Sequence, residues 1–238
     1  MLRVGHLDRS AARRKAVPSG GSVIHKTPII GPLAGETEAP TGFLVEQPPD
    51  VTIRPHFHFN CQFQVFVAGE GRLGRHPVRP LIVQYVGAHT GYGPIVAGTA
   101  APLWYLTLRP SVTSGAHYLP DERDRLDMTI PKRQVMSPPF DVGGPLDETR
   151  VDACLAPAVD GLAAWTVRLP PRRRIDAPRH PGGVGRYLLV AAGEMRVSDE
   201  RLGPLGLAWA TQDDESVPLE AGDAGLEAIV MQFPTGAF

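Results

Sequence analysis

The sequence predicts an all-β protein in which one β-rich unit occurs twice in tandem. Glycine (26 residues) and proline (25 residues) are spread along the 238 residues, which favours many short strands joined by turns over long helices. Apolar residues make up 42% of the chain and charged residues 21%, as expected for a globular protein with an apolar core. A repeat of constant offset divides this chain into two units.

The repeat is clearest around two strand-like segments that end in Gly-Glu. Segment 62–70 reads QFQVFVAGE and segment 186–194 reads RYLLVAAGE, so Gly69 and Gly193 are 124 residues apart (193 − 69). The same offset aligns 56–110 with 180–234. It pairs His56 with His180, Arg72 with Arg196, Pro80-Leu81 with Pro204-Leu205, Pro94 with Pro218, Ala97-Gly98 with Ala221-Gly222, Ala100 with Ala224 and Pro110 with Pro234. Because all these pairs share one register, we expect two copies of one fold.

Each copy shows the alternation of a β-strand. Phe63, Val65 and Val67 alternate with more polar neighbours, and the Gly-Glu-Gly turn that follows suits a positive φ. We expect further strands at 81–86, 103–108, 187–191, 205–210 and 226–233. Residues 111–150 break the pattern and predict a loop-rich connector, with a short helix starting near 120–126.

Composition excludes several function classes. The formal net charge of −1 provides no general attraction for nucleic acid or anionic lipid. Two cysteines, Cys61 and Cys154, cannot build a disulfide framework or a four-cysteine zinc site. No apolar run is long enough to span a membrane, and the polar segment Met1–Lys15 lacks the features of a secretory signal, so we expect a cytoplasmic protein. No nucleotide-binding motif occurs.

The segment that carries chemistry is Arg-Pro-His-Phe-His at 54–58. On a strand, His56 and His58 project to one face, where two neutral imidazoles form a natural chelate. Gln62 follows after a short turn, and Gln64 shares its face.

The spacing His-x-His-x₃-Gln-x₆-Gly, which ends at Gly69, resembles the first signature of the cupin superfamily. In that signature the position of Gln62 holds glutamate. The resemblance implies two tandem jelly-roll barrels of the RmlC-like type (a bicupin), as in pirin-like proteins in which one barrel is metal-competent. The predicted organisation is an N-terminal arm at 1–25, a first cupin barrel at 26–140 and a second barrel at 141–238.

The resemblance also implies a divalent metal ion (Fe, Mn, Ni, Cu or Zn) on His56, His58, Gln62 and a fourth ligand, His89. Two departures matter. A glutamine oxygen is a weaker ligand than a carboxylate, because it offers a dipole instead of a charge. The interval from His56 to His89 is also short for the family's second signature. The alternative is a loop histidine that caps a turn.

The second copy serves as an internal control. At the offset of 124 (193 − 69), His58 becomes Gly182, Gln62 becomes Arg186 and His89 becomes Asp213. These residues cannot hold a metal of this type. The second barrel is therefore predicted to be degenerate and either structural or able to bind an anion through Arg186.

Two functions follow from the first copy. The leading hypothesis is a mononuclear metal-dependent enzyme, dioxygenase-like or an isomerase, that acts on a small organic molecule. The alternative is a non-catalytic small-molecule-binding or structural bicupin without metal. Gln64, Tyr92 and Arg109 are the candidate pocket residues, with Arg109 either clamping a carboxylate or forming a surface ion pair. By resemblance, a homodimer is expected.

Overall fold

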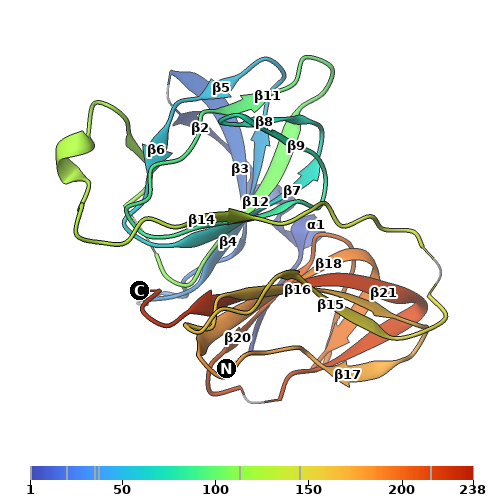
Figure 1. Cartoon of the computed structure of the whole chain (residues 1–238). Coiled ribbons are helices and arrows are strands. Elements are labelled where there is room, and N and C mark those ends of the chain that lie inside the picture. The colour runs from blue at the N-terminus through green and yellow to red at the C-terminus, as the bar shows by residue number, and fades with distance from the viewer. Residues whose placement is uncertain are drawn as a thin grey trace. The chain divides into compact units, whose positions relative to one another are not determined.

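The computed structural model describes residues 2–19, 21–34, 36, 38–112, 114–144, 146–214 and 216–237. The chain divides into two compact units (Figure 1). Ala11–Pro139 with Ala237–Phe238 form one unit, which we call the first barrel. Met1–Ser10 with Phe140–Gly236 form the other, the second barrel. Both are built almost entirely of antiparallel strands, which confirms the all-β prediction.

The first barrel contains thirteen strands and two short 3-10 turns in its described residues. They are η1 (Ala11–Arg13), β2 (Lys15–Ser19), β3 (Ser22–Ile30), β4 (Thr41–Gln47), β5 (Thr52–Ile53), β6 (His56–Phe57), β7 (Gln62–Ala68), β8 (Gly71–Leu73), β9 (His76–Val78), β10 (Val83–Val86), β11 (Ile95–Ala97), β12 (Leu103–Arg109), β13 (His117–Tyr118), η2 (Arg123–Arg125) and β14 (Gln134–Met136). One sheet has the order β14-β10-β7-β12-β4-β3-β2 and another β5-β11-β8-β9, while β13 pairs with β6.

The second barrel has one main sheet, in the order β1-β20-β18-β21-β16-β15, with β17 added to β21 and β19 to β18. Its elements are β1 (Arg3–Gly5), α1 (Leu7–Ser10), β15 (Arg150–Leu155), β16 (Ala163–Leu169), β17 (Arg174–Asp176), β18 (Gly183–Val197), β19 (Glu200–Leu202), β20 (Leu207–Thr211) and β21 (Pro218–Pro234). No described helix is long and apolar enough to cross a bilayer.

The repeat is visible in backbone detail. Leu81 and Leu205 occupy equivalent turns with φ of 63° and 62°. In the first barrel the Leu81 N–H donates to the Phe66 carbonyl, and in the second the Leu205 N–H donates to the Val190 carbonyl. Two unrelated turns would not share an unusual left-handed leucine and the same hydrogen bond. The duplication is therefore structural as well as sequential.

The sequence offset between equivalent residues of the two copies changes from 124 to 123 before the last strand of each copy. A Cβ on Gly69 would meet Leu103 Cα at 3.2 Å, and a Cβ on Gly193 would meet Leu226 Cα at the same distance. Leu103 and Leu226 are 123 residues apart (226 − 103), not 124. The ungapped alignment predicted for this stretch is thus wrong beyond Gly98, and the structural counterpart of Arg109 is Gln232.

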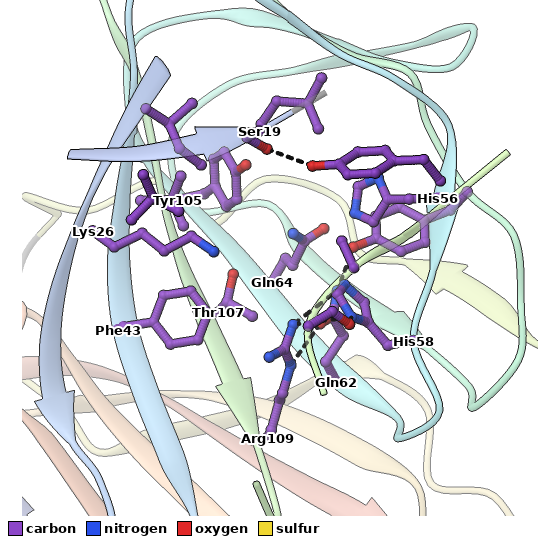
Figure 2. A pocket seen from close by; sticks show the side chains of 18 of the residues that line it. Ser19, Lys26, Phe43, His56, His58, Gln62, Gln64, Tyr105, Thr107 and Arg109 are labelled. Atoms are coloured by element: carbon purple, nitrogen blue, oxygen red, sulfur yellow. Dashed lines mark hydrogen bonds between the residues drawn. The ribbon is translucent and has the colours of Figure 1, made fainter. Parts of the chain in front are cut away.

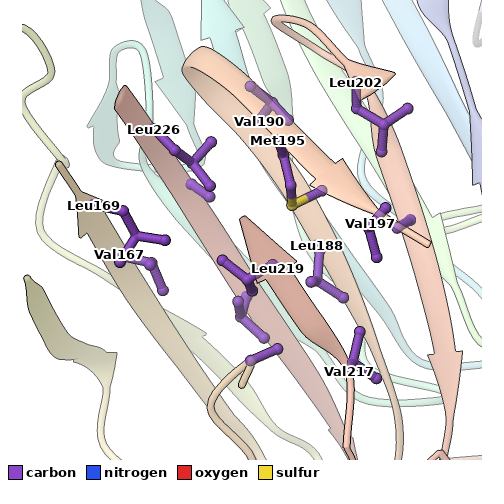
Figure 3. Packing of buried hydrophobic residues seen from close by; sticks show 14 of the residues in the cluster. Val167, Leu169, Leu188, Val190, Met195, Val197, Leu202, Val217, Leu219 and Leu226 are labelled. Atoms are coloured by element: carbon purple, nitrogen blue, oxygen red, sulfur yellow. The ribbon is translucent and has the colours of Figure 1, made fainter. Parts of the chain in front are cut away.

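The interiors of the two barrels differ. The second barrel is filled by an apolar cluster that includes Leu188, Val190 and Leu226, all fully buried (Figure 3). Burying each such side chain contributes about 1.5–3 kcal/mol before entropy is counted. The first barrel has an apolar cluster around Phe66 and Ile95, but the inward face of β7 also carries Gln62 and Gln64. Only the first barrel has a polar interior of this kind among the described residues.

Segment 1–25 differs from the predicted arm. Arg3, Val4 and Gly5 pair with Trp209, Ala208 and Leu207 of β20, so β1 is an edge strand of the second barrel. Strands β2 (Lys15–Ser19) and β3 (Ser22–Ile30) pair with each other in the first barrel. Edge strands are held largely by backbone hydrogen bonds, which leave little trace in side-chain pattern.

The helix expected to start near 120–126 is only the 3-10 turn η2. Its residues are not buried, so no apolar face stabilises a longer helix, and short helices are marginal without one. Beside this turn, Asp121 pairs with Arg54 at 2.7 Å.

Candidate functional site

The first barrel encloses a cavity of about 240 Å³. This is slightly below the range of about 300–1,000 Å³ typical for drug-sized ligands, so the cavity suits a smaller molecule. Its polar and charged lining residues point into one space (Figure 2). They are Ser19, Lys26, His56, His58, Gln62, Gln64, Tyr92, Tyr105, Thr107, Arg109 and Tyr118.

The sheet register explains why these side chains meet. Successive inward residues of one strand are two apart, and residues opposite each other on paired strands share a face. Thr107 of β12 lies opposite Gln64 of β7, and Gln64 lies opposite Gln84 of β10. One step along the strands, Arg109 reaches Gln62. The inward face is thus an ordered grid of polar groups.

His56 and His58 are the predicted pair, and the structure brings them together with ring centroids 5.3 Å apart. His56 is fixed by two backbone hydrogen bonds to Tyr92, each 3.0 Å. Its Nδ1 lies 2.8 Å from the carbonyl oxygen of Arg54, and Nδ1 of His58 lies 2.5 Å from that of Gly115. A carbonyl can only accept, so both Nδ1 atoms carry the proton and both Nε2 atoms present a lone pair.

Both imidazoles are neutral at pH 7. Burial lowers the pKa of His56 to about 4; the Arg54 carbonyl opposes this, and the charges of Arg109 and Lys26 add to it. Burial and the adjacent Arg109 hold the pKa of His58 well below its usual range. The pair therefore acts as hydrogen-bonding groups and not as cations.

Gln62, placed by its sequence in a ligand position, is engaged at both ends of its amide. Arg109 Nε donates to its Oε1 at 3.0 Å, and its Nε2 donates to the Tyr92 hydroxyl at 2.6 Å. Arg109 Nη2 lies 3.2 Å from His58 Nε2 and 3.3 Å from Nδ1. Because these two distances are nearly equal, Nη2 lies against the ring and not along the Nε2 lone pair, while Nδ1 donates to the Gly115 carbonyl. One connected network thus joins Tyr92, Gln62, Arg109 and His58.

Lys26 is a cavity residue that the sequence did not single out. Its Nζ lies 5.2 Å from the centre of the Phe43 ring, and the Arg109 guanidinium carbon lies 5.4 Å from the same centre. Burial lowers the pKa of Lys26 to about 8, and the positive charges of Arg109 and Lys15 add to the effect. It is still mostly protonated at pH 7. None of the described lining residues is a carboxylate, so the cavity is cationic.

His89 is not among the described lining residues of the cavity. It sits in a turn with φ of 52°, and its ring stacks on Phe59 with centroids 4.9 Å apart. Its Nδ1 accepts a hydrogen bond of 3.1 Å from the backbone N–H of Asp127. This arrangement corresponds to the alternative in which His89 caps a turn.

The described residues do not fit a divalent metal ion. They include no group of three or more His, Cys, Asp or Glu close enough to hold one. The neutral candidate, Gln62, already uses its oxygen for Arg109, and the positively charged guanidinium lies against the ring of His58. A cation placed there would face an arginine at van der Waals range, with no carboxylate among the described lining residues to offset the repulsion.

Gln64, Tyr92 and Arg109, the predicted pocket residues, all line the cavity, as does Tyr105. Tyr85 and Trp104 are not in its described lining. In a strand, alternate residues face opposite sides, so Tyr105 and Trp104 cannot both point inward.

In the second barrel the residue types of one facing pair are exchanged. Arg186 lies opposite Gln232, which matches Gln62 opposite Arg109 with the two residue types exchanged. The Nε2 of Gln232 donates to the carbonyls of Gly161 and His180, and Arg186 Nη2 donates to the Asp214 carbonyl at 3.1 Å. The rest of the described interior is apolar.

No protein-family model matches the chain, and no curated protein sequence does. Solved structures do. A bacterial pirin from Escherichia coli in complex with nickel(II) is 12% identical, with a TM-score of 0.60 and coverage of 98% of this chain and 99% of that one. An oxalate decarboxylase formate complex from Lactobacillus farciminis is 13% identical (TM-score 0.62, coverage 94% and 85%). A pumpkin seed globulin is 13% identical (TM-score 0.65, coverage 100% and 86%). These likenesses show that the chain has a tandem cupin fold.

Proposed function

We propose that the first barrel binds a small organic anion, most simply a carboxylate. One observation carries the proposal: the cavity holds two cationic side chains, Arg109 and Lys26, and no carboxylate among its described lining residues. The positive charge of the half-buried Lys26 is costly to desolvate, and an anionic ligand beside it would offset that cost. The oxalate decarboxylase of similar fold was solved as a formate complex, and formate belongs to this class of ligand.

Each group has a distinct part in such binding. Arg109 is held in place by Gln62, so its charge is already oriented before a ligand arrives. Lys26 supplies a second positive charge beside the same Phe43 ring. His56 contributes a neutral Nε2 that accepts a hydrogen bond. Charge-assisted hydrogen bonds of the kind that Arg109 and Lys26 donate contribute about 1.5–3 kcal/mol each.

Thermal unfolding with matched ligands tests the proposal. Succinate, glycerate and benzoate are each compared with the uncharged amide of the same skeleton. A ligand at about 100 times its Kd adds about 2.7 kcal/mol, enough to raise Tm measurably. We expect at least one acid to stabilise the protein and its amide to have no effect. Lys26→Met and Arg109→Met should each raise the Kd of that acid at least tenfold.

Arg75→Met is the matched control, because Arg75 is an exposed turn residue of the same barrel. It should leave the Kd unchanged. Equal stabilisation by acid and amide, or unaltered binding in both cavity variants, would show that the cavity does not select anions.

A second candidate function is the metal-dependent enzyme, dioxygenase-like or an isomerase. One observation favours it: both histidines donate Nδ1–H to backbone carbonyls, as metal-binding histidines do. The engagement of Gln62 and Arg109 opposes it. Elemental analysis of protein purified without an affinity tag decides between the two. Less than about a tenth of an equivalent of Fe, Mn, Ni, Cu or Zn would exclude a resident metal; a full equivalent, lost in His56→Ala/His58→Ala and retained in His180→Ala, would establish it.

A further inference from the structure

A row of polar side chains crosses the interior of the first barrel next to the cationic end. Thr107, Gln64 and Gln84 lie opposite one another on β12, β7 and β10. Their exposed fractions are 3%, 2% and 0%. We call these three residues the polar row. Thr107 and Gln64 line the cavity, and Figure 2 shows both side chains directed toward the space that Lys26 and Arg109 also face.

The polar row has unused hydrogen-bonding capacity. Gln64 Oε1 has no hydrogen-bond partner among the residues that the structure describes, and the same is true of Oε1 and Nε2 of Gln84. A buried amide atom without a partner carries its full desolvation penalty. Buried polar groups in native proteins are nearly always satisfied, and of the two glutamines only Gln64 is among the described residues that line the cavity, so its amide is the one that a ligand can approach.

The duplicated barrel shows that the fold does not require this row. At the positions equivalent to Thr107, Gln64 and Gln84, the second barrel has Val230, Leu188 and Ala208. All three are fully buried members of its apolar cluster. The same strands therefore close into a barrel with an apolar row. The polar version occurs in the barrel that has the cationic cavity.

We infer that the ligand of the first barrel is a hydroxycarboxylate, whose carboxylate faces Arg109 and Lys26 while a hydroxyl group bonds the amide of Gln64 and the hydroxyl of Thr107. The inference rests on the proposed anion-binding function and specifies its ligand class. A hydroxyl is the matching group because it both donates to Gln64 Oε1 and accepts a hydrogen bond. Arg109 and Thr107 are two residues apart on one strand, about 7 Å, which suits a hydroxyl a few bonds from the carboxylate.

The test compares acids with and without hydroxyl groups on the same carbon skeleton. Glycerate is paired with propionate, and gluconate with hexanoate, and Kd is measured by isothermal titration calorimetry on the full chain at pH 7.5. We expect the hydroxylated member of at least one pair to bind at least tenfold tighter. A site built to hydrogen-bond a hydroxyl disfavours the analogue that lacks it, because its own polar groups then stay unpaired.

Gln64→Met and Thr107→Val keep side-chain size and remove the polar atoms. In each variant the Kd of the hydroxylated acid should rise to within about threefold of the Kd of the matching acid without hydroxyl groups. Gln134→Met is the control, since Gln134 is exposed on β14 of the same barrel, and should keep the full preference. Thermal unfolding of each variant verifies that it is folded, and the two variants alter different strands, so misfolding of one leaves the other informative.

The possible failures are distinguishable. If wild-type protein binds both members of each pair equally, the hydroxycarboxylate inference is wrong while anion binding stands. A preference that survives in both Gln64→Met and Thr107→Val would overturn the assignment to the polar row. If no acid binds at all, and the amide comparison is also negative, the proposed function itself fails.

Discussion

At the scale of single residues, the first barrel depends on neutral histidines beside fixed positive charge. His56 and His58 are buried near Arg109, so protonating either would place a further cation in the cavity. Their role as hydrogen-bonding groups is therefore limited to pH values at which the fold keeps them neutral.

A pH dependence of stability follows from His56. Its pKa is about 6.5 when unfolded and about 4 when folded, so the unfolded chain binds more protons in between. The contribution of neutral His56 to the free energy of unfolding is complete above pH 6.5. It is lost as the pH falls toward 4, by an amount on the order of 3 kcal/mol. Urea unfolding measured between pH 7.5 and 4.5 should show this loss in wild-type protein and a smaller one in His56→Gln.

The control for that series is His76→Gln, because His76 is an exposed residue of the same barrel. Its slope of unfolding free energy against pH should match that of wild-type protein. Identical slopes for His56→Gln and wild-type protein would contradict the assignment of His56 as a buried neutral base.

At the scale of elements, the equivalent residues Gly69, which follows β7, and Gly193, which lies within β18, show how closely the backbones approach. Gly69 has φ of 73°, and a Cβ there would lie 2.1 Å from the carbonyl oxygen of Pro102. Gly193 has φ of 78°, and its Cβ would lie 2.2 Å from that of Gly225. Only glycine fits at either position, which explains why both copies of the repeat keep glycine there.

We expect Gly69→Ala and Gly193→Ala each to destabilise the protein by more than about 2 kcal/mol. The left-handed conformation alone costs an alanine about 1–2 kcal/mol, and the backbone must also shift. Urea or thermal unfolding measures the effect. Gly31→Ala is the control, since a Cβ there meets nothing within 4 Å, and should change stability by less than about 1 kcal/mol. A harmless Gly69→Ala would show that the turn is looser than described.

At the scale of the whole molecule, the two barrels share one fold but differ in the side chains of their interiors. The second barrel is filled with side chains and uses its apolar cluster for stability. In the first barrel, polar and charged groups around a cavity replace part of the core.

The equivalent positions Gln64 and Leu188 test this division directly. Leu188→Ala removes atoms from a packed core and should cost about 2–5 kcal/mol. Gln64→Ala removes a side chain that lines a cavity and has an unpaired oxygen, so its effect on unfolding should stay within about 1 kcal/mol. Equal losses for the two variants would mean that the first barrel is packed as tightly as the second.

The fold was predictable because its signals are local. Alternation in 62–68, the shared register of Gly69 and Gly193 and the His-x-His spacing are all properties of short segments. The His-x-His spacing indicated His56 and His58 as a pair, and both of them line the cavity of the first barrel. The N-terminal edge strand β1 was not predictable, because it is recruited through its backbone by β20, near the opposite end of the chain.

The sequence by itself determined the duplication, the all-β architecture and which copy carries the candidate site residues, because periodicity and spacing encode these. Tertiary structure decided the charge of the site. Lys26 of β3 lines the cavity. Arg109, for which the sequence also allowed a surface ion pair, contacts Gln62 and His58 inside the barrel. His89 instead stacks on Phe59 and accepts a hydrogen bond from the backbone N–H of Asp127. Pairing between distant strands sets which side chains share an interior, and no local pattern contains that information.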